Sequence, residues 1–381
     1  MDATIKSRLT KFWHNVQETL FPFLNEIEVE LTPKLKEVVT TLELVQIERF
    51  LPYEAGVGRP PKDRVALARA FIAKAALDLP TTEALIDRLK VDTALRRICG
   101  FSTTHSIPGS HRFSRAFAEF TQVRLAERCH EALIQTHLGD QIIGHITRDS
   151  TAIEAREKPL AKTEEEKKEE KKAKAAAEAA AKANPPRRGR PKKDEVRPPK
   201  PDTRIEKQQK MTLAQMIADL PNGCDTGCKT DSQGFKYTWR GYKLHIDVAD
   251  GDIPVNAILT SASVHDSQVA MPLMTSTSKK LDYLYDVADS AYCSPILNAA
   301  SRSLGHVPLI DHNPRRGEKI EFEPHEAERY KVRSQSERVN AYLKDSHGGS
   351  HVWVKGSNKI FSHLMLGITV IAAQQILRLL Q

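Results

Sequence analysis

The hydrophobic pattern changes its period near residue 141, and this change limits what the chain can fold into. Before it, apolar residues recur at helical spacing, as at Leu67, Ala70 and Phe71. After it, short apolar segments typical of strands alternate with helical ones. The pattern therefore predicts an all-α helical domain over residues 1–138, followed by an α/β domain that has a mixed sheet with helices on both faces.

The helical region carries start and stop signals for short helices. Thr81 or Thr82 can cap one helix, and Asp92 can cap another that ends at Gly100. Further helices are expected over residues 64–76 and from about 110 to 137. Short helices joined by tight turns suit a helix-turn-helix unit that binds DNA, and they suit other small helical domains equally well.

The α/β part begins with a strand over residues 141–148 that is expected to end at Asp149. The segments that follow alternate between the two periods. The expected strands cover residues 235–248, 253–259, 281–288 and 306–310, and the expected helices cover residues 266–276, 294–304, 325–344 and 359–380. The domain thus takes residues 139–154 and 211–381, and a low-complexity insertion divides it.

The insertion, residues 155–210, has a composition that does not build a core. It is rich first in Lys, Glu and Ala and then in Pro and basic residues, so we expect it to be disordered or partly helical until DNA is present. Residues 156–210 hold 19 Lys or Arg and 11 Asp or Glu, a surplus that equals the net charge of +8 of the whole chain. Net charge alone therefore does not show that the folded parts bind nucleic acid.

A short basic run lies inside this insertion. Arg187 and Arg188 precede a Gly-Arg-Pro core whose arginine is Arg190. The run resembles an AT-hook, which lays cations along the narrow minor groove of A·T-rich DNA. Basic runs with proline are also common in linkers. DNA binding and a spacer role both stay open.

Nothing in the sequence is typical of secretion or of a membrane span. We expect no secretory leader, and the longest apolar run, Leu364–Ala373, is about half of the ~20 residues that a span needs. Five cysteines suit a reducing compartment. Cys224 and Cys228 could start a zinc site, but no second ligand pair stands at zinc spacing, so ordinary thiols are expected. The expected location is the cytoplasm, without membrane contact.

Three acidic residues occupy positions from which they could form a metal site. Asp149 and Asp289 each follow an expected strand, and Glu337 lies on the helix after the last strand. Loops at the strand ends of α/β sheets converge on ligands, and carboxylates suit Mg²⁺ or Mn²⁺. Two such ions about 4 Å apart can catalyse phosphodiester transfer. Taken singly, each acid could equally be a solvated or capping residue.

The segment around Glu337 is expected to place polar residues on one helix face. At ~100° per residue, Arg333, Glu337 and Lys344 lie within about 60° of Tyr330. A tyrosine, two cations and an acid make a poor apolar core and a plausible surface for phosphates. An Arg333–Glu337 surface ion pair is the alternative.

These four residues match the Y-(2)-R-(3)-E-(6)-K signature of one large group of bacterial DDE transposases, which the chain resembles. Asp149 and Asp289 resemble the first and second catalytic aspartates of that group, although the group more often has Gly where Ala291 stands. Further landmarks are similar at residues 58–61, 107–110, 241–245 and 263–267. The resemblance covers about residues 55–150 and 232–380, and compact relatives lack the long insertion.

The resemblance implies an RNase H-like catalytic fold that works with Mg²⁺, or Mn²⁺ in its place, as two ions. Asp149, Asp289 and Glu337 would be the catalytic metal ligands, while Tyr330, Arg333 and Lys344 would hold DNA phosphates. The implied reaction is cleavage at the ends of an insertion sequence and joining to target DNA. The implied partners are double-stranded DNA, as terminal inverted repeats and target, and a second copy of the chain, in the bacterial cytoplasm at the nucleoid.

Alternatives stay open at several positions. The second acid could be Asp286, although Asp289 fits the strand end and the motif better. Asp266 is expected to cap its helix rather than bind metal. Trp239 and Trp353 are expected to pack rather than to stack on an extruded base. Rival functions are an RNase H-like endonuclease that never joins strands and a domesticated DNA-binding protein whose catalysis has lapsed.

Overall fold

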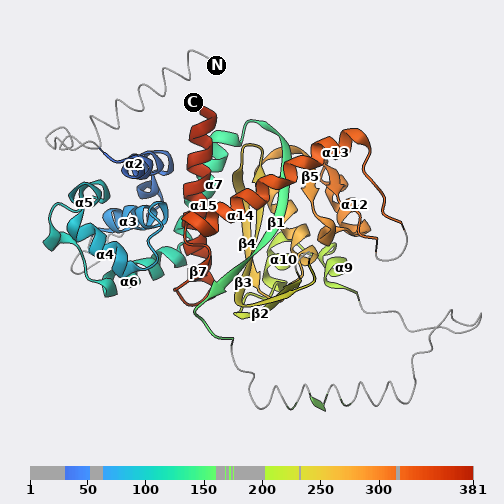
Figure 1. Cartoon of the computed structure of the whole chain (residues 1–381), viewed down its shortest axis with the longest axis horizontal. Helices are drawn as coiled ribbons and strands as arrows, with labels where there is room; N and C mark the ends of the chain where they lie inside the picture. The colour runs from blue at the N-terminus through green and yellow to red at the C-terminus, as the bar shows by residue number, and fades with distance from the viewer. Residues whose placement is uncertain are drawn as a thin grey trace, which may run out of the picture.

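The computed structural model describes residues 31–51, 63–159, 202–230, 233–314 and 318–380, and a few positions between 168 and 175. Helix α15 (Ser357–Leu380) runs between a group of N-terminal helices and a sheet (Figure 1). By length and composition α15 could cross a membrane, yet 78% of its most apolar stretch is buried inside the protein. It is the core helix that joins the two halves of the fold.

The N-terminal helices begin and end at the expected caps. Thr81 Oγ1 accepts the Ala84 N–H at 3.1 Å and Asp92 Oδ1 accepts the Leu95 N–H at 2.9 Å, while Gly100, at a φ of 99°, ends the second of these helices. The elements are α2 (Pro33–Val45), η2 (Ile47–Phe50), α3 (Arg64–Ala76), α4 (Thr82–Val91), α5 (Thr93–Cys99), η3 (Thr104–Ser106), α6 (Ser110–Gln122) and α7 (Leu125–Leu138).

The prediction of a single helix from about residue 110 to 137 is wrong, because the helix is broken near its middle. Arg124 has a φ of 53°, a left-handed conformation that separates α6 from α7. Phe113, Phe117 and Phe120 of α6 pack against Phe71 of α3, whereas α7 packs against α15 and the sheet. One straight helix could not reach both surfaces, so tertiary packing overrides the continuous helical pattern.

A mixed seven-stranded sheet forms the second half of the fold. Its strands are β1 (Ile142–Ala155), β2 (Asp225–Thr230), β3 (Lys236–Ala249), β4 (Ile253–Ser261), β5 (Asp282–Ala288), β6 (Val307–Ile310) and β7 (His351–Val352). The main order is β2-β3-β1-β5-β6; β4 pairs with β3, and β7 pairs with β1. The predicted hairpin is present as antiparallel β3 and β4. Strand β1 runs parallel to β5 and antiparallel to β3.

Strand β1 continues beyond the point where the sequence suggested that it ends. Its pairing with β5 stops at Arg148 opposite Ala288, but its pairing with β3 continues to Glu154. Asp149 therefore lies inside β1, at the end of only the parallel part. The polar residues after Asp149 did not look like a strand because their burial comes from β3 and β7 alongside, not from an apolar pattern of their own.

Helices cover both faces of the mixed sheet, as the sequence predicted. One face carries α7, α15 and α14 (Ser334–Ser346), and the other carries α10 (Leu213–Asp219), α11 (Ser267–Ser278) and α12 (Pro295–Ser303) (Figure 1). The short helix α9 (Arg204–Gln208) packs on α11 and α12. It lies inside the segment 155–210, which was expected to be disordered. Folded structure therefore resumes earlier than expected. The physical reason is burial, since Ile205 packs against a core cluster and Gln208 is buried.

Candidate active site

The register of the sheet brings two of the three predicted acids together. Arg148 of β1 pairs with Ala288 of β5, so the next residues, Asp149 and Asp289, lie side by side at the carboxyl end of β5. Asp289 then caps a 3₁₀ turn by accepting the Ala291 N–H at 3.0 Å. This edge is where α/β sheets expose groups to a ligand.

Helix α14, which carries the third acid, lies against the same edge. Asn340 of α14 donates a hydrogen bond from Nδ2 to Asp149 Oδ2 at 3.0 Å, which fixes the helix against β1. Glu337 lies three residues earlier, ~4.5 Å along the helix axis and on nearly the same face. Its carboxylate pairs with Arg333 at 2.6 Å. The Arg333–Glu337 ion pair considered in the sequence is therefore formed.

Carboxylates crowd this edge and perturb each other. Burial raises the pKa of Asp149 to about 6, assisted by Asp289 and Asp266 and opposed by the Ser150 N–H and Lys229. Burial also raises the pKa of Asp289, again against the hydrogen bond from its cap. Burial is the main cause of both shifts, because it disfavours the ionised carboxylate, and the neighbouring acids add to it.

Three cations border the carboxylates. Arg333 partly opposes the rise in the pKa of Asp289, and burial together with nearby Lys229 lowers the pKa of Lys344. Lys229 stands on β2, a strand that the sequence pattern did not predict. It was missed because β2 is short and largely exposed, so no apolar alternation reveals it.

The predicted stripe on one continuous helix is wrong in its geometry. The segment breaks into α13 (Pro324–Tyr330), a 3₁₀ turn over Lys331–Arg333, and α14. Tyr330 packs on the Phe322 ring with ring centroids 4.8 Å apart, and the 3₁₀ turn lies against β1 and β5. The chain bends to follow the sheet edge, and the bend puts Arg333 close enough to interact with Asp149 and Asp289.

The oxygen-only donor set suits a hard divalent cation, although the acids are not closed around one. Among the residues that the structure describes, no three His, Cys, Asp or Glu side chains are gathered tightly enough to hold a metal ion as they stand. A cation beside Asp149 would favour the ionised carboxylate and so lower the pKa that burial raises. Asp149 and Asp289, as two adjacent carboxylates, have the donor chemistry that such an ion prefers.

Two family models match the chain. The Transposase domain (DUF772) matches residues 26–119, and the Transposase DDE domain matches residues 224–372. The chain belongs to the insertion-sequence DDE transposases. No curated protein and no solved structure matches it. The first match covers the N-terminal helices as far as α6, and the second runs from β2 into α15, while β1, which carries Asp149, lies outside both. The two matches confirm the resemblance drawn from the sequence and the RNase H-like fold class that it implied.

Asp286, the alternative second acid of the transposase, is buried in an ion pair. That residue is 1% exposed and accepts a hydrogen bond from Arg148 at 2.9 Å, inside a cluster that Asp247 completes. Because side chains alternate along a strand, Arg148 and Asp149 point to opposite faces of β1. Asp286 thus neutralises a buried guanidinium and lies away from Asp149.

Asp266 does not cap its helix, contrary to expectation. Its backbone is already helical and its side chain makes no capping hydrogen bond. The carboxylate instead pairs with Lys243 Nζ at 3.0 Å, and it raises the pKa of both Asp149 and Asp289. The landmark segments 241–245 and 263–267 of the transposase therefore meet beside the acids, through Lys243 and Asp266.

The predictions for the transposase also concerned two tryptophans, the cysteines and three arginines of the insertion. Trp239 is buried and donates its indole N–H to the Tyr242 carbonyl at 3.0 Å, as expected for a packing residue. Trp353 is 49% exposed, so it is less buried than expected for a packing residue, and its ring meets the His351 ring edge-on with ring centroids 5.0 Å apart. None of the five cysteines forms a disulfide bond. Arg187, Arg188 and Arg190 lie outside the described residues.

Proposed function

We propose that this DNA transposase cleaves the ends of its insertion sequence and joins them to target DNA by phosphoryl transfer at the carboxylate site. The observation that carries the proposal is the adjacency of Asp149 and Asp289, whose pKa values burial raises. DDE transposases generally use divalent metals. Mg²⁺, with Mn²⁺ as a substitute, suits these oxygen ligands. Two bound ions would supply activation of the attacking oxygen and stabilisation of the leaving one.

Glu337 is the third proposed ligand, and it must exchange partners to act. Its side chain is 54% exposed, so the ion pair with Arg333 contributes at most about 1 kcal/mol. Rotation of Glu337 toward Asp149 would complete the set of acids. The same movement would free the Arg333 guanidinium, whose forked donors suit a phosphate. The ion pair therefore supports a resting arrangement that substrate and metal reorganise.

The cations around the acids would position the DNA strand. Arg333 and Lys344 carry charge that can meet phosphate oxygens, and the Tyr330 hydroxyl can donate a further hydrogen bond. We add Lys229 to this set, because it acts electrostatically on Asp149, Asp289 and Lys344. Asn340 would hold Asp149 in place through its amide hydrogen bond.

The wider assembly is part of the same proposal. The helical domain, residues 1–138, would recognise the terminal inverted repeats, and residues 139–154 with 211–381 would form the catalytic domain. Joining needs two ends at once, so a homodimer on DNA in the cytoplasm is the proposed active form. Arg187, Arg188 and Arg190 of the insertion would add contacts in the minor groove.

A strand-joining assay tests this function. The substrates are a duplex that ends in the terminal repeat, a precleaved version with a free 3′-hydroxyl, and a target duplex, each with Mg²⁺. We expect the wild-type protein to cleave the first and to join the second to the target. The Asp289→Asn variant should bind both and process neither. Hydrolysis without any joining would favour the endonuclease, and binding without either reaction would favour a protein whose catalysis has lapsed.

A further inference from the structure

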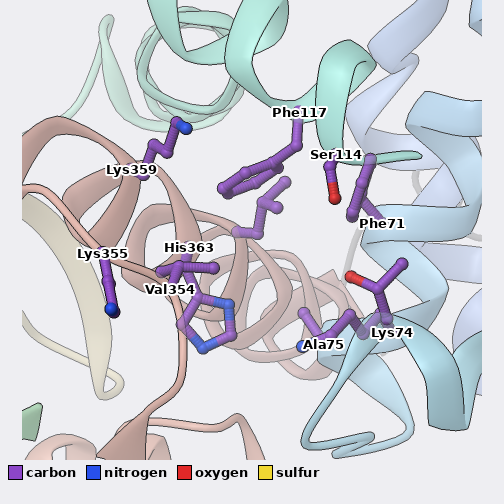
Figure 2. A pocket seen from close by; sticks show the side chains of 11 residues that line it. Phe71, Lys74, Ala75, Ser114, Phe117, Val354, Lys355, Lys359 and His363 are labelled. Atoms are coloured by element: carbon purple, nitrogen blue, oxygen red, sulfur yellow. The ribbon is translucent and has the colours of Figure 1, made fainter. Parts of the chain in front are cut away.

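A pocket of about 210 Å³ lies between the helical region and α15, outside the carboxylate site. Figure 2 shows Phe71, Lys74 and Ala75 of α3 on one side, and Val354, Lys355, Lys359 and His363 facing them from the other. Ser114 of α6 and Thr82, the first residue of α4, complete the polar lining. Its volume is several times the ~30 Å³ of a water molecule, so it has room for a phosphate and the adjoining sugar.

The lining of this pocket is cationic. It contains three lysines and no acidic residue. The first turn of α4 adds the positive end of a helix dipole beside Thr82. Among the residues that the structure describes, Lys74, Lys355 and Lys359 have neither an ion pair nor a hydrogen-bond partner. Such a set attracts an anion and repels a cation.

Lys74 is the most buried cation of this pocket. Its side chain is only 8% exposed and lines the pocket, and among the described residues no carboxylate forms an ion pair with it. Burial lowers the pKa of Lys74 to about 8, and Asp78 opposes this only partly. Burial, with Lys74 nearby, lowers the pKa of His363 to about 3, so His363 is neutral. A buried amine normally has a partner, and here the space for one is open.

The pocket is placed where DNA that occupies the active site could reach it. Strand β1 leads from Asp149 to Glu154, which pairs with His351 of β7, and Lys355 follows shortly after β7. At ~3.3 Å per residue, this path puts the pocket on the order of 20 Å from the carboxylates. One DNA strand covers that distance in about six nucleotides at ~3.4 Å each.

We propose that this pocket receives a backbone phosphate of the transposon-end DNA, with Lys74 at its base and Lys355 and Lys359 at its rim. The inference rests on the proposed function, because it assigns the anion to the DNA that the transposase processes. It adds a contact at which the helical region and the catalytic region hold the same strand. The phosphate would set the distance between the recognised repeat and the cleaved bond.

Lysine footprinting tests the proposal directly. The full-length protein is acetylated in EDTA, with and without terminal-repeat duplex, and the modified lysines are identified by mass spectrometry. We expect duplex to protect Lys74, Lys355 and Lys359, and not Lys279, an exposed lysine at the end of α11. A parallel sample with dAMP shows whether a free nucleotide is the true occupant. Protection by dAMP without protection by duplex would overturn the assignment to DNA.

The salt dependence of binding provides the second measurement. The Lys355→Gln/Lys359→Gln variant alters only exposed residues and should fold normally. Loss of two phosphate contacts should lower the slope of log K against log salt by about two, so affinity falls about tenfold less than in wild type between 50 and 200 mM salt. Lys279→Gln is the matched control. An unchanged slope with unprotected Lys74 would refute the pocket alone, whereas wild-type protein that does not bind the duplex would refute the proposed function as well.

Discussion

Glu337 forms an ion pair with Arg333 in the structure. One substitution distinguishes its two possible roles, which are metal ligand and surface ion-pair partner. Glu337→Gln keeps the shape and removes the charge. A hard cation binds an amide far less well than a carboxylate, so we expect cleavage and joining to fall by several orders of magnitude while DNA binding is retained. Glu328→Gln is the control, because Glu328 is also exposed and paired with a cation, Lys331. Near-normal cleavage by Glu337→Gln would leave only a surface ion pair.

The ionisation of Asp149 predicts a dependence of stability on pH. Burial raises the pKa of this carboxyl from its ordinary value of 3.8 to about 6. Folding therefore favours the protonated form, and ionisation lowers the free energy of unfolding as pH rises from about 4 to 6. Asp149→Asn removes that cost, so without metal the variant should be more stable than wild type at pH 7, by about 1 to 3 kcal/mol.

Chemical unfolding at pH 7 and pH 4 measures this effect. The difference between Asp149→Asn and wild type should largely disappear at pH 4, where both side chains are neutral. Added Mg²⁺ should stabilise wild type at pH 7 and have little effect on the variant, because a ligand stabilises the state that binds it. Equal stabilities at both pH values would show that burial does not disfavour the ionised form of Asp149.

Substitution by Asn should lower stability at Asp286 and abolish cleavage at Asp289. Asp286→Asn leaves Arg148 buried with one partner fewer, which costs about 3 to 5 kcal/mol for a buried ion pair. Asp289→Asn removes a charge that burial disfavours, so it should not destabilise the protein while it abolishes cleavage. Urea unfolding and cleavage assays on both variants distinguish them. A stable, inactive Asp286→Asn protein would make Asp286 the second catalytic acid.

At the scale of elements, the close approach of the paired strands β1 and β3 depends on Gly241. This residue has a φ of 151°, and a Cβ there would lie 2.1 Å from the Ile153 carbonyl oxygen. Gly241→Ala should therefore separate the two strands and cost about 2 to 4 kcal/mol. Gly223→Ala is the matched control, since a Cβ there meets nothing within 4 Å. Equal stability of the two variants in urea unfolding would contradict the close approach.

At the scale of the whole molecule, α15 links regions that are far apart in the sequence. It packs on α2, α3 and α7 as well as on β4, within one continuous apolar cluster. A fragment that ends at Leu138 lacks this helix, so we expect it to unfold without a cooperative transition. Thermal unfolding followed by circular dichroism measures this, and a fusion of the fragment to residues 357–380 is the control. A sharp transition for the fragment alone would show that the predicted domain folds by itself.

The sequence by itself determined the positions of most elements and the identity of the candidate acids. Caps such as Thr81 and Asp92 act within one helical turn, and strand alternation acts within a few residues, so both are visible without the fold. The signature from Tyr330 to Lys344 identified the family because its spacing is specific. Burial was also predictable where an apolar face is continuous, as in α3 and α15.

Only the tertiary structure decided how these pieces meet. The extension of β1 past Asp149, the break at Arg124 and the bend over Lys331–Arg333 each follow from packing against surfaces distant in sequence. The pairing of Arg148 with Asp286, the approach of Lys229 to the acids and the pocket around Lys74 arise in the same way. Burial and charge balance depend on which distant residues come into contact, and a local pattern does not contain that information.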